Sequence, residues 1–368
     1  MIVGLHPDCV GAESYSEKWA EVLRRRGVEV RPLDLLAPDA LRRAGECDGV
    51  MWRWMHHPQD KQSAQRILYV IEHQLGIPVY PDSATAWHYD EKIAQFYLLE
   101  ALGAPVPRTW LFWRTEDALA WVREAPYPVV LKLSSGAGSA NVLLVESARR
   151  ARELVERLFL HGLFPYSVNE FAPPTGCPRS WRQAKALIGR ALAGLRYTWG
   201  GRYPPLPYYW RPEHGYAYFQ EFLPGNEFDT RITVIGRRAF GFRRFNRPGD
   251  FRASGSGRLE HDPEAVDRRC LEIAFDLSRR GRFQSMAYDF LMQAGRPVVA
   301  EISYAFADTA VHDCPGHWDE SLKWAPGNLW PEEAQVEDFL SRLESRAAAP
   351  AARGTGMAGG RLPTRPVP

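Results

Sequence analysis

The sequence predicts a mixed chain, in which a small parallel α/β lobe comes first and α+β segments follow. Over residues 1–80, short apolar runs alternate with helical patterns, which is typical of a parallel sheet flanked by helices. From residue 109 onward, apolar runs follow one another across short glycine or proline turns, which indicates β-hairpins. The length of 368 residues allows two or three domains with ample core.

The composition is that of a soluble globular protein without a marked charge. Hydrophobic residues make up 45% of the chain, charged residues make up 24%, and the formal net charge is only +2. Such a small net charge gives no global field that favours nucleic acid or a membrane surface. We therefore expect neither of them as a partner.

The cysteines and the N-terminal residues bear on the cellular compartment. The five cysteines are scattered and never form a Cys-x-x-Cys pair, which fits free thiols in a reducing compartment. The first residues lack the pattern of a signal peptide, and no apolar run approaches the length of a membrane span. We expect a cytoplasmic protein.

Residues 1–82 are expected to form the first domain. Its helices are predicted to end at glycines, which favour the backbone conformation that closes a helix. We place strands over residues 2–5, 28–33, 49–54 and 77–80, and helices over residues 16–26 and 64–75, closed by Gly27 and Gly76.

Residues 83–160 predict one helix and then a β-α-β-β-α order. The helix over residues 90–102 is stopped by Gly103, and Pro105 keeps the chain that follows extended. We assign residues 105–160 to a smaller lobe. Its strands are placed over residues 110–113, 129–133 and 141–145, and its helices over residues 116–124 and 148–159.

Residues 161–217 read as an insertion with one helical piece near residues 182–192. A long connection rich in proline and tyrosine is usually either functional or an addition to a regular scaffold. Its aromatic side chains could cover a cleft or receive a substrate, and an added packed subdomain is the alternative. The side chains in question are Trp181, Arg182, Tyr197, Trp199, Tyr203, Tyr208, Tyr209 and Trp210.

A C-terminal lobe is expected over residues 218–346. From residue 347 onward the chain is rich in Ala, Pro, Gly and Arg, has no periodicity, and is predicted to be a disordered tail. The lobe is expected to contain strands over residues 217–222, 227–235 and 238–245, a helix over residues 263–281, and a hairpin over residues 288–306.

The hairpin over residues 288–306 carries a carboxylate on each of its two strands, Asp289 and Glu301. A charged group is costly to bury in an apolar strand unless it is paired or bound to a metal. Two such carboxylates on paired strands suit a hard cation such as Mg²⁺. The alternative is that both side chains point to solvent, because strands alternate their faces.

A turn rich in small residues, Ser134–Ala140, follows Lys132. Glycines let backbone N–H groups approach phosphate oxygens, and a lysine on the preceding strand can neutralise them. The turn is not a Walker loop, because it leads into a strand and lacks the Gly-Lys-Ser/Thr ending. A loose hairpin turn without a ligand is the alternative.

A third candidate is the segment Gln220–Gly236, in which a strand, a Pro-Gly turn and a second strand follow one another. Along the second strand, Glu227, Asp229 and Arg231 alternate with apolar residues and share one face. This face is either solvated or part of a polyanion site. The second interpretation is favoured by the downstream Arg243, Arg244, Asn246 and Arg252.

In this order, the segments resemble the ATP-grasp superfamily over about residues 83–306, and within it the carboxylate-amine ligases similar to ribosomal-protein–glutamate ligase. The resemblance implies an N-terminal α/β pre-ATP-grasp lobe followed by a two-lobed fold that holds ATP between its lobes. It also implies which residues contact the nucleotide. These are Lys92, Lys132, Ser135, Gly136, Gly138, Gln220, Glu221, Leu223 and Asp229.

The resemblance also implies a metal site. Asp289 and Glu301 match the positions that hold one or two Mg²⁺ ions in the family, for which Mn²⁺ can substitute. The family's third ligand is typically Asn, and Ser303 stands at that position here. A hydroxyl is a weaker ligand than an amide oxygen, so Ser303 decides how well a metal would be held.

The implied activity is an ATP- and Mg²⁺-dependent ligase that joins a carboxylate to an amine or thiol through an acylphosphate. Arg231 and Arg244 are the implied catalytic residues, because they would stabilise the transferred phosphoryl group. The expected partners are a small carboxylate and a small amine, and the sequence leaves a homodimer open. The alternatives are a nucleotide-binding protein without turnover and a phosphotransferase on the same fold.

One cluster stays outside the resemblance, namely His312, Cys314 and His317. These residue types bind zinc, but their spacing matches no closed Cys/His site. Because the cluster follows the hairpin closely, contact with an acceptor substrate is the more attractive interpretation.

Overall fold

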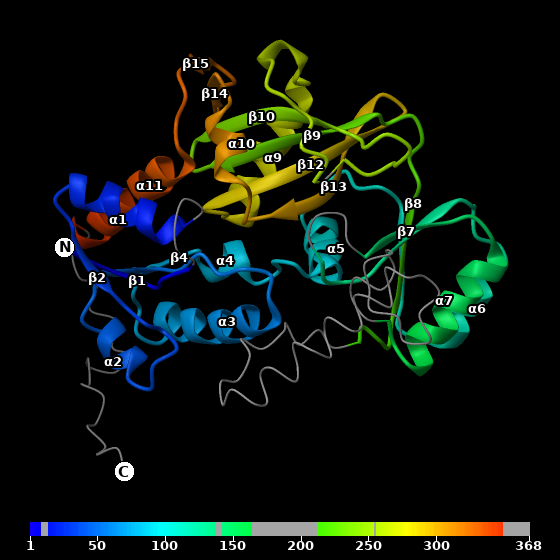
Figure 1. Ribbon diagram of the computed structural model, residues 1–368, viewed down its shortest axis with the longest axis horizontal. Coiled ribbons are helices and arrows are strands. Elements are labelled where there is room, and N and C mark those ends of the chain that lie inside the picture. Colours follow the sequence, from blue (N-terminus) through cyan, green and yellow to red (C-terminus); the bar gives the residue numbers. More distant parts are fainter. Residues whose placement is uncertain (9–13, 137–140, 164–211, 254, 349–368) are drawn as a thin grey trace, which may run out of the picture.

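The computed structural model describes residues 1–8, 14–136, 141–163, 212–253 and 255–348. In these ranges the strands form three sheets, and Figure 1 shows them from the N-terminal lobe on the left to the region of β7, β8, α6 and α7 on the right. We call them the N-terminal sheet, the large sheet and the small sheet. No helix in the described ranges is long and apolar enough to cross a membrane.

The N-terminal sheet is parallel and has the strand order β2-β1-β3-β4, as the alternation of strands and helices predicted. Helix α3 begins at Pro58, six positions before the predicted start, because proline fits the first turn of a helix. The elements are β1 (Ile2–Leu5), α1 (Tyr15–Arg25), β2 (Glu29–Pro32), α2 (Ala40–Ala44), β3 (Gly49–Met51), α3 (Pro58–His73) and β4 (Val79–Tyr80).

Helix α11 (Pro331–Ala348) packs against this lobe and was not predicted from the sequence. Figure 1 shows α11 beside α1, although about three hundred residues separate them. Trp19 of α1 donates a hydrogen bond to Oε1 of Gln335 at 2.9 Å, and Phe339 joins the same core. The C-terminal helix therefore completes the N-terminal lobe.

The small sheet is antiparallel, with the order β5-β8-β6-β7, and has its own core beneath α6 and α7. We placed the strand at residues 217–222 in the C-terminal lobe, and this was wrong, because β8 pairs with β5 and β6. The elements between residues 83 and 221 are α4 (Ser83–Ala86), α5 (Lys92–Ala101), β5 (Thr109–Phe112), α6 (Thr115–Val122), β6 (Val129–Lys132), β7 (Val142–Val145), α7 (Ala148–Leu160) and β8 (Ala217–Glu221).

The large sheet has the order β13-β12-β9-β10-β14-β15, with β11 beside β10. The predicted hairpin is confirmed, with its turn at Ala294 and Gly295, which both have positive φ. The elements are β9 (Phe228–Ile235), β10 (Arg238–Phe245), β11 (Leu259–Glu260), η1 (Pro263–Ala265), α9 (Arg268–Gly281), β12 (Ser285–Gln293), β13 (Arg296–Ser303), α10 (Asp308–His312), β14 (Gly316–Asp319) and β15 (Trp324–Pro326).

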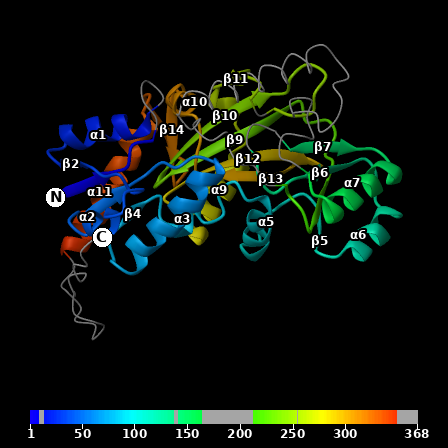
Figure 2. The ribbon, with the colours of Figure 1, turned by 60° about the horizontal axis from the view of Figure 1, so that its bottom comes forward.

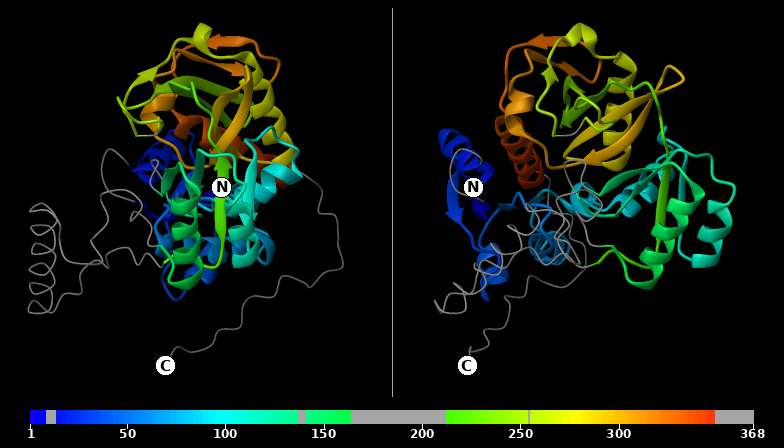
Figure 3. Two further views of the ribbon diagram at one scale, coloured as in Figure 1. Left: turned by 90° about the vertical axis from the view of Figure 1, so that its right-hand side faces the viewer. Right: turned by 45° about the vertical axis from the view of Figure 1, so that its right-hand side comes forward.

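The large sheet extends from the N-terminal lobe to the small sheet, as Figures 2 and 3 show. An aromatic cluster joins it to the N-terminal lobe, since Tyr304 follows β13 and its hydroxyl donates to the Trp54 carbonyl. Tyr89 packs edge-on against both rings. The small sheet, by contrast, keeps a separate core, and the main pocket lies where these two sheets meet.

Candidate functional site

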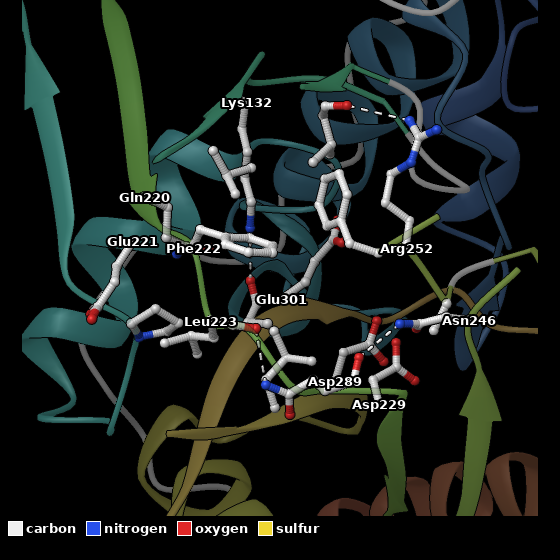
Figure 4. Close-up of a pocket in the computed structure, with 18 of the residues that line it drawn as sticks. Lys132, Gln220, Glu221, Phe222, Leu223, Asp229, Asn246, Arg252, Asp289 and Glu301 are labelled. Atoms are coloured by element: carbon white, nitrogen blue, oxygen red, sulfur yellow. Dashed lines mark hydrogen bonds between the residues drawn. The ribbon is translucent and has the colours of Figure 1, made fainter. Parts of the chain in front are cut away.

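A pocket with an empty volume of about 970 Å³ lies between the small and large sheets. Figure 4 shows Lys132 reaching into it from one side and Asp229, Asp289 and Glu301 lying on the other. The small sheet contributes Val130, Lys132, Val142 and Gln220, and the large sheet contributes Asp229, Arg244, Asp289, Leu291 and Glu301. The pocket therefore brings together residues that lie far apart in the sequence.

Strand register places a row of charges across the large sheet. Arg244 is opposite Asp229, Arg231 is opposite Asp289, and Asp289 is opposite Glu301. Because residues opposite one another share a face, all five side chains belong to one side of the sheet. Asp229 is only 8% exposed and Arg231 is half-buried, so the interpretation as a solvated face is wrong for these two residues, whereas Glu227 is exposed.

Two arginines neutralise the two aspartates of this row. Arg231 donates from Nε and Nη2 to the two oxygens of Asp289, at 2.6 and 2.8 Å. Arg244 donates to both oxygens of Asp229 at 2.7 Å, and its Nη2 is also 2.7 Å from Oδ2 of Asp289. These are charge-assisted fork contacts, the strongest kind of side-chain hydrogen bond.

The pKa of Asp289 follows from these contacts. Burial alone would raise it, but Arg231 and Arg244 outweigh burial and hold the pKa of Asp289 well below its ordinary value. Burial and the neighbouring charge of Asp289 raise the pKa of Asp229. Asp289 is thus ionised and already paired, so the predicted metal ligand is engaged by the two predicted catalytic arginines.

Glu301 is the more accessible of the two predicted metal carboxylates. Its side chain is 38% exposed and its Oε1 lies 3.5 Å from Nζ of Lys92. Ser303 does not line the pocket, because its hydroxyl donates to the Ala305 carbonyl at 2.7 Å. In the described ranges no group of three or more His, Cys, Asp or Glu residues is arranged to hold a metal.

Oxygen donors of this kind still fit a hard cation. Mg²⁺ is commonly held by one or two carboxylates together with phosphate oxygens of a ligand. Glu301 faces the pocket, and Asp289 is directly opposite it across the strands, with a register shift immediately after Asp289. A cation here would have to share Asp289 with Arg231 and Arg244.

Lys132 crosses from the small sheet to the large one. Its Nζ donates to the Ala300 carbonyl at 3.4 Å, and no carboxylate among the described residues forms an ion pair with it. Burial lowers the pKa of Lys132 to about 8, and the nearby charge of Glu301 only partly opposes this. Lys132 is therefore a cation whose charge would be stabilised by an incoming anion.

Lys92, the other predicted nucleotide lysine, lies behind the pocket. It is 5% exposed, and its Nζ donates to the Gly136 carbonyl at 2.8 Å and approaches Glu301. Lys92, Lys132 and Glu301 line a second, much smaller cavity on that side. Lys92 links the glycine turn to the large sheet and does not border the main pocket.

The glycine turn is held by acidic side chains that were not predicted from the sequence. Gly136 donates from its backbone to Asp90 at 2.8 Å, and Ser135 donates from its backbone to Glu213 at 3.2 Å. Ser134 donates its hydroxyl to Glu91. The N–H groups of Ser135 and Gly136 thus already have acceptors, so their contact with a phosphate stays a prediction, and Gly138 lies outside the described residues.

Burial raises the pKa of Asp90 to about 6, against the charges of Lys92 and Lys61. Asp90 and Glu91 directly precede Lys92, so a run of two acids before a lysine was the available signal. These acids occupy the donors of the turn, and they make release of the turn a step that ligand phosphates would have to drive.

The end of β8 forms an apolar slot beside the charges. Phe222 and Phe251 meet edge to plane at 5.6 Å, and Leu223 and Leu291 complete the slot. Gln220 and Glu221, which are expected to contact the nucleotide, line the pocket, and both have partners within the protein. Gln220 donates to Thr109 Oγ1 at 3.2 Å, and Glu221 accepts from Gln293 at 2.8 Å.

Arg252 closes the pocket on the side of the loop after β10. It lines the pocket, donates to the Val142 carbonyl of β7 at 3.3 Å, and is also paired with Asp250 at 2.7 Å. Its contact with β7 thus joins the large and small sheets through one side chain (Figure 4).

The remaining candidate residues do not line the main pocket or lie outside the described residues. His312 stacks on Trp330, Cys314 is buried, and His317 packs against Phe240, so this cluster is divided among separate packing contacts. None of the three lines the main pocket. The aromatic residues of the insertion, from Trp181 to Trp210, fall outside the described residues.

The chain resembles known proteins in structure but not in sequence. No protein-family model matches the chain, and no curated protein matches it in sequence. A structure of D-cycloserine synthetase aligns with 93% of this chain and 100% of its own, at a TM-score of 0.55 and 15% identity.

Two other solved structures give the same result. D-alanine–D-alanine ligase from Bacillus anthracis aligns with 94% of this chain and 99% of its own, at a TM-score of 0.53 and 12% identity. A RimK domain protein ATP-grasp from Sphaerobacter thermophilus covers 93% of this chain and 100% of its own, at a TM-score of 0.50 and 18% identity. With its small and large sheets enclosing the charged pocket, the chain has the fold of the ATP-grasp superfamily.

Proposed function

We propose that the protein is an ATP- and Mg²⁺-dependent ligase that joins a substrate carboxylate to an amine or a thiol. The observation that carries this proposal is the main pocket, where Lys132 of one sheet faces Asp289, Glu301 and Arg244 of another. Similar folds occur in D-alanine–D-alanine ligase and in an ATP-grasp ligase solved with Mg and ADP.

The apolar slot would bind the base of the nucleotide, and the charged residues would bind its phosphates. The slot of Phe222, Leu223 and Leu291 suits a purine ring, because flat apolar surfaces stabilise aromatic ligands. Lys132 lies at the far side, where it would neutralise phosphate oxygens and recover its full positive charge.

Mg²⁺, when bound, would neutralise the phosphate oxygens and orient them for transfer. Glu301 and Asp289 are the residues that would hold it. Arg231 and Arg244 keep Asp289 ionised and hold its carboxylate from β9 and β10, which lie on the side of β12 opposite the strand of Glu301. Their N–H groups are also the nearest fixed positive charges for a phosphoryl group in transfer.

The chemistry follows a balanced two-step course. The γ-phosphoryl group passes from ATP to a carboxylate oxygen of the substrate, and ADP leaves with the electrons of the broken P–O bond. An amine or thiol then attacks the acyl carbon, and phosphate leaves as the new bond forms. No side-chain nucleophile is required, so positioning and charge neutralisation are the tasks of these residues.

A second candidate is a nucleotide-binding protein without turnover, and two observations favour it. Ser303 is committed to the Ala305 carbonyl, and Asp289 is committed to two arginines. Both arrangements weaken the hold on a divalent cation. A phosphotransferase on the same fold would leave its phosphate on the substrate.

One assay separates these functions. The purified full chain is incubated with ATP, Mg²⁺ and a pooled set of small carboxylates and amines, and ADP, free phosphate and phosphorylated products are measured together. A ligase releases ADP and phosphate in equal amounts and only with a substrate pair present. ATP binding, measured by titration, without any ADP release supports a nucleotide-binding protein without turnover. ADP release without free phosphate supports a phosphotransferase.

A further inference from the structure

A second pocket lies at the carboxyl ends of β1 and β3, where the N-terminal sheet meets the chain after β13. His6 follows β1, Arg53 follows β3, Tyr15 comes from α1, and Phe306 comes from the chain after β13. Its volume is about 1510 Å³, and it shares no lining residue with the main pocket between the small and large sheets, where we place the nucleotide. We call it the Arg53 pocket.

The sheet topology makes this position a natural binding site. In the order β2-β1-β3-β4, the chain turns one way from β1 to β2 and the other way to reach β3. The loops that leave β1 and β3 therefore diverge and open a crevice at the carboxyl ends of these strands. Ligands of open α/β sheets bind in crevices of this kind.

Arg53 is fixed in place but has hydrogen-bond donors to spare. Its guanidinium lies over the Tyr15 ring at 4.0 Å, and its Nη2 donates to the Phe306 carbonyl at 3.3 Å. The Tyr15 hydroxyl donates to the same carbonyl at 2.9 Å. Nη1 donates to the Met55 sulfur at 3.1 Å, so these contacts use two of the five N–H groups of an arginine.

No carboxylate in the described part of the chain forms an ion pair with Arg53. The contrast with Arg231 and Arg244 is direct, because each of those arginines is paired with an aspartate. Removing a cation from water without an anion costs free energy, which a bound anion would recover. The position of Arg53 thus suits an anionic ligand.

The other charges of the pocket limit which anion fits. Burial lowers the pKa of His6 and of His57, so both are neutral near neutral pH, and Arg53 is the cation among the lining residues. Asp8, Asp60 and Asp308 also line the pocket and repel a doubly charged group, although Asp308 is paired with Lys18. A planar carboxylate with one charge matches the fork of one guanidinium.

The Arg53 pocket is also close to the nucleotide pocket along the chain. Glu301 lines the nucleotide pocket, and Phe306, five positions later, lines the Arg53 pocket. Five extended residues span at most about 17 Å, so these two lining positions are no farther apart than that.

We propose that the Arg53 pocket binds a small molecule through a carboxylate held by Arg53, with Tyr15, Trp52 and Phe306 packing against its carbon skeleton. If the proposed function holds, on which this step rests, this molecule is one of the two substrates of the ligase. Arg53 is then a substrate-anchoring residue of the N-terminal lobe, distinct from the residues that handle ATP.

The test measures binding without turnover, so it does not depend on the ligase reaction. The full chain, without nucleotide, is examined by saturation-transfer NMR against acetate, succinate and benzoate, against their neutral amides, and against inorganic phosphate. At least one carboxylate is expected to bind more tightly than its amide and than phosphate. Arg53→Gln should weaken that carboxylate by about tenfold or more, and Arg53→Lys should weaken it less, because lysine keeps the charge but not the fork.

Two controls separate the possible failures. Arg42→Gln removes an exposed arginine of α2 in the same lobe and should leave carboxylate binding unchanged. ADP titration of Arg53→Gln should match the wild type, which shows that the variant is folded. The proposal is overturned when no carboxylate of the set binds the wild type, or when Arg53→Gln binds it equally well. Carboxylate binding without ADP binding would instead refute the proposed function alone.

Discussion

Arg244 and Lys132 lie on opposite walls of the same pocket, and their charges are balanced in opposite ways. Arg244 contacts two aspartates at 2.7 Å, whereas Lys132 has one carbonyl at 3.4 Å and no carboxylate partner among the described residues. The large sheet thus has its charges paired before any ligand arrives. The small sheet presents a cation whose balance depends on a ligand, which is the asymmetry expected of a site that closes on an anion.

Asp289→Asn should have the largest effect on stability, because it removes a paired charge of the large sheet. Loss of this carboxylate leaves Arg231 and Arg244 with less negative charge in a buried setting, so the free energy of unfolding should fall by about 3 kcal/mol or more. Urea denaturation of the two proteins measures it. Asp276→Asn, which removes two exposed ion pairs on α9, should cost less than about 1 kcal/mol. An equally small loss for Asp289→Asn would contradict the difference between the two sheets.

Lys132→Met removes the cation of the small sheet. It should lower ATP affinity without lowering stability. Because Lys132 is buried and lacks a carboxylate partner in the described ranges, its removal should leave the free energy of unfolding unchanged or raised. Affinity for ATP should fall by about tenfold to a hundredfold, as expected for a lost charge-assisted contact. Calorimetric titration of ATP provides the measurement, and unaltered affinity would remove Lys132 from the nucleotide site.

The pH dependence of ATP binding sharpens the same point. Burial lowers the pKa of Lys132 to about 8 in the free protein, and bound phosphates would stabilise its charged form. ATP affinity should therefore decrease as pH rises through about 8, by up to about tenfold between pH 7 and pH 9. Titrations of wild type and Lys132→Met at matched pH isolate this term, since the variant should lack it. Parallel curves for the two proteins would assign the dependence to another group.

Ser303→Ala should have the smallest effect. The Ser303 hydroxyl donates to the Ala305 carbonyl, so its loss should cost about 1 kcal/mol of unfolding free energy. The Mg²⁺ concentration for half-maximal ADP release should change by less than about twofold, because Ser303 does not line the pocket. A Mg²⁺ requirement raised tenfold or more would instead make Ser303 a ligand.

Much of the fold could be predicted from periodicity, because strands and helices impose their own spacing. The parallel N-terminal sheet, the strands β9 and β10, and the hairpin of β12 and β13 all follow the expected pattern. Strand partners across long separations could not be predicted. Nothing in the sequence of β8 says that it pairs with β5 and β6, and nothing in α11 says that it covers α1.

The candidate site was predicted as a set of residues but not as a set of contacts. Alternation along β9 indicated that Asp229 and Arg231 share a face, and the structure agrees. Which carboxylate each arginine takes depends on the register of three strands, which spacing does not supply. Likewise, the acids that hold the glycine turn, Asp90 and Glu213, reach it from separate segments.

The most direct test of the account is a crystal structure of the full chain with a non-hydrolysable ATP analogue and Mg²⁺. We expect the base in the slot of Phe222 and Leu291, and the triphosphate between Lys132 and Glu301. A nucleotide bound elsewhere, or a triphosphate out of reach of Lys132, would contradict the central claim that the pocket between the small and large sheets is the ATP site.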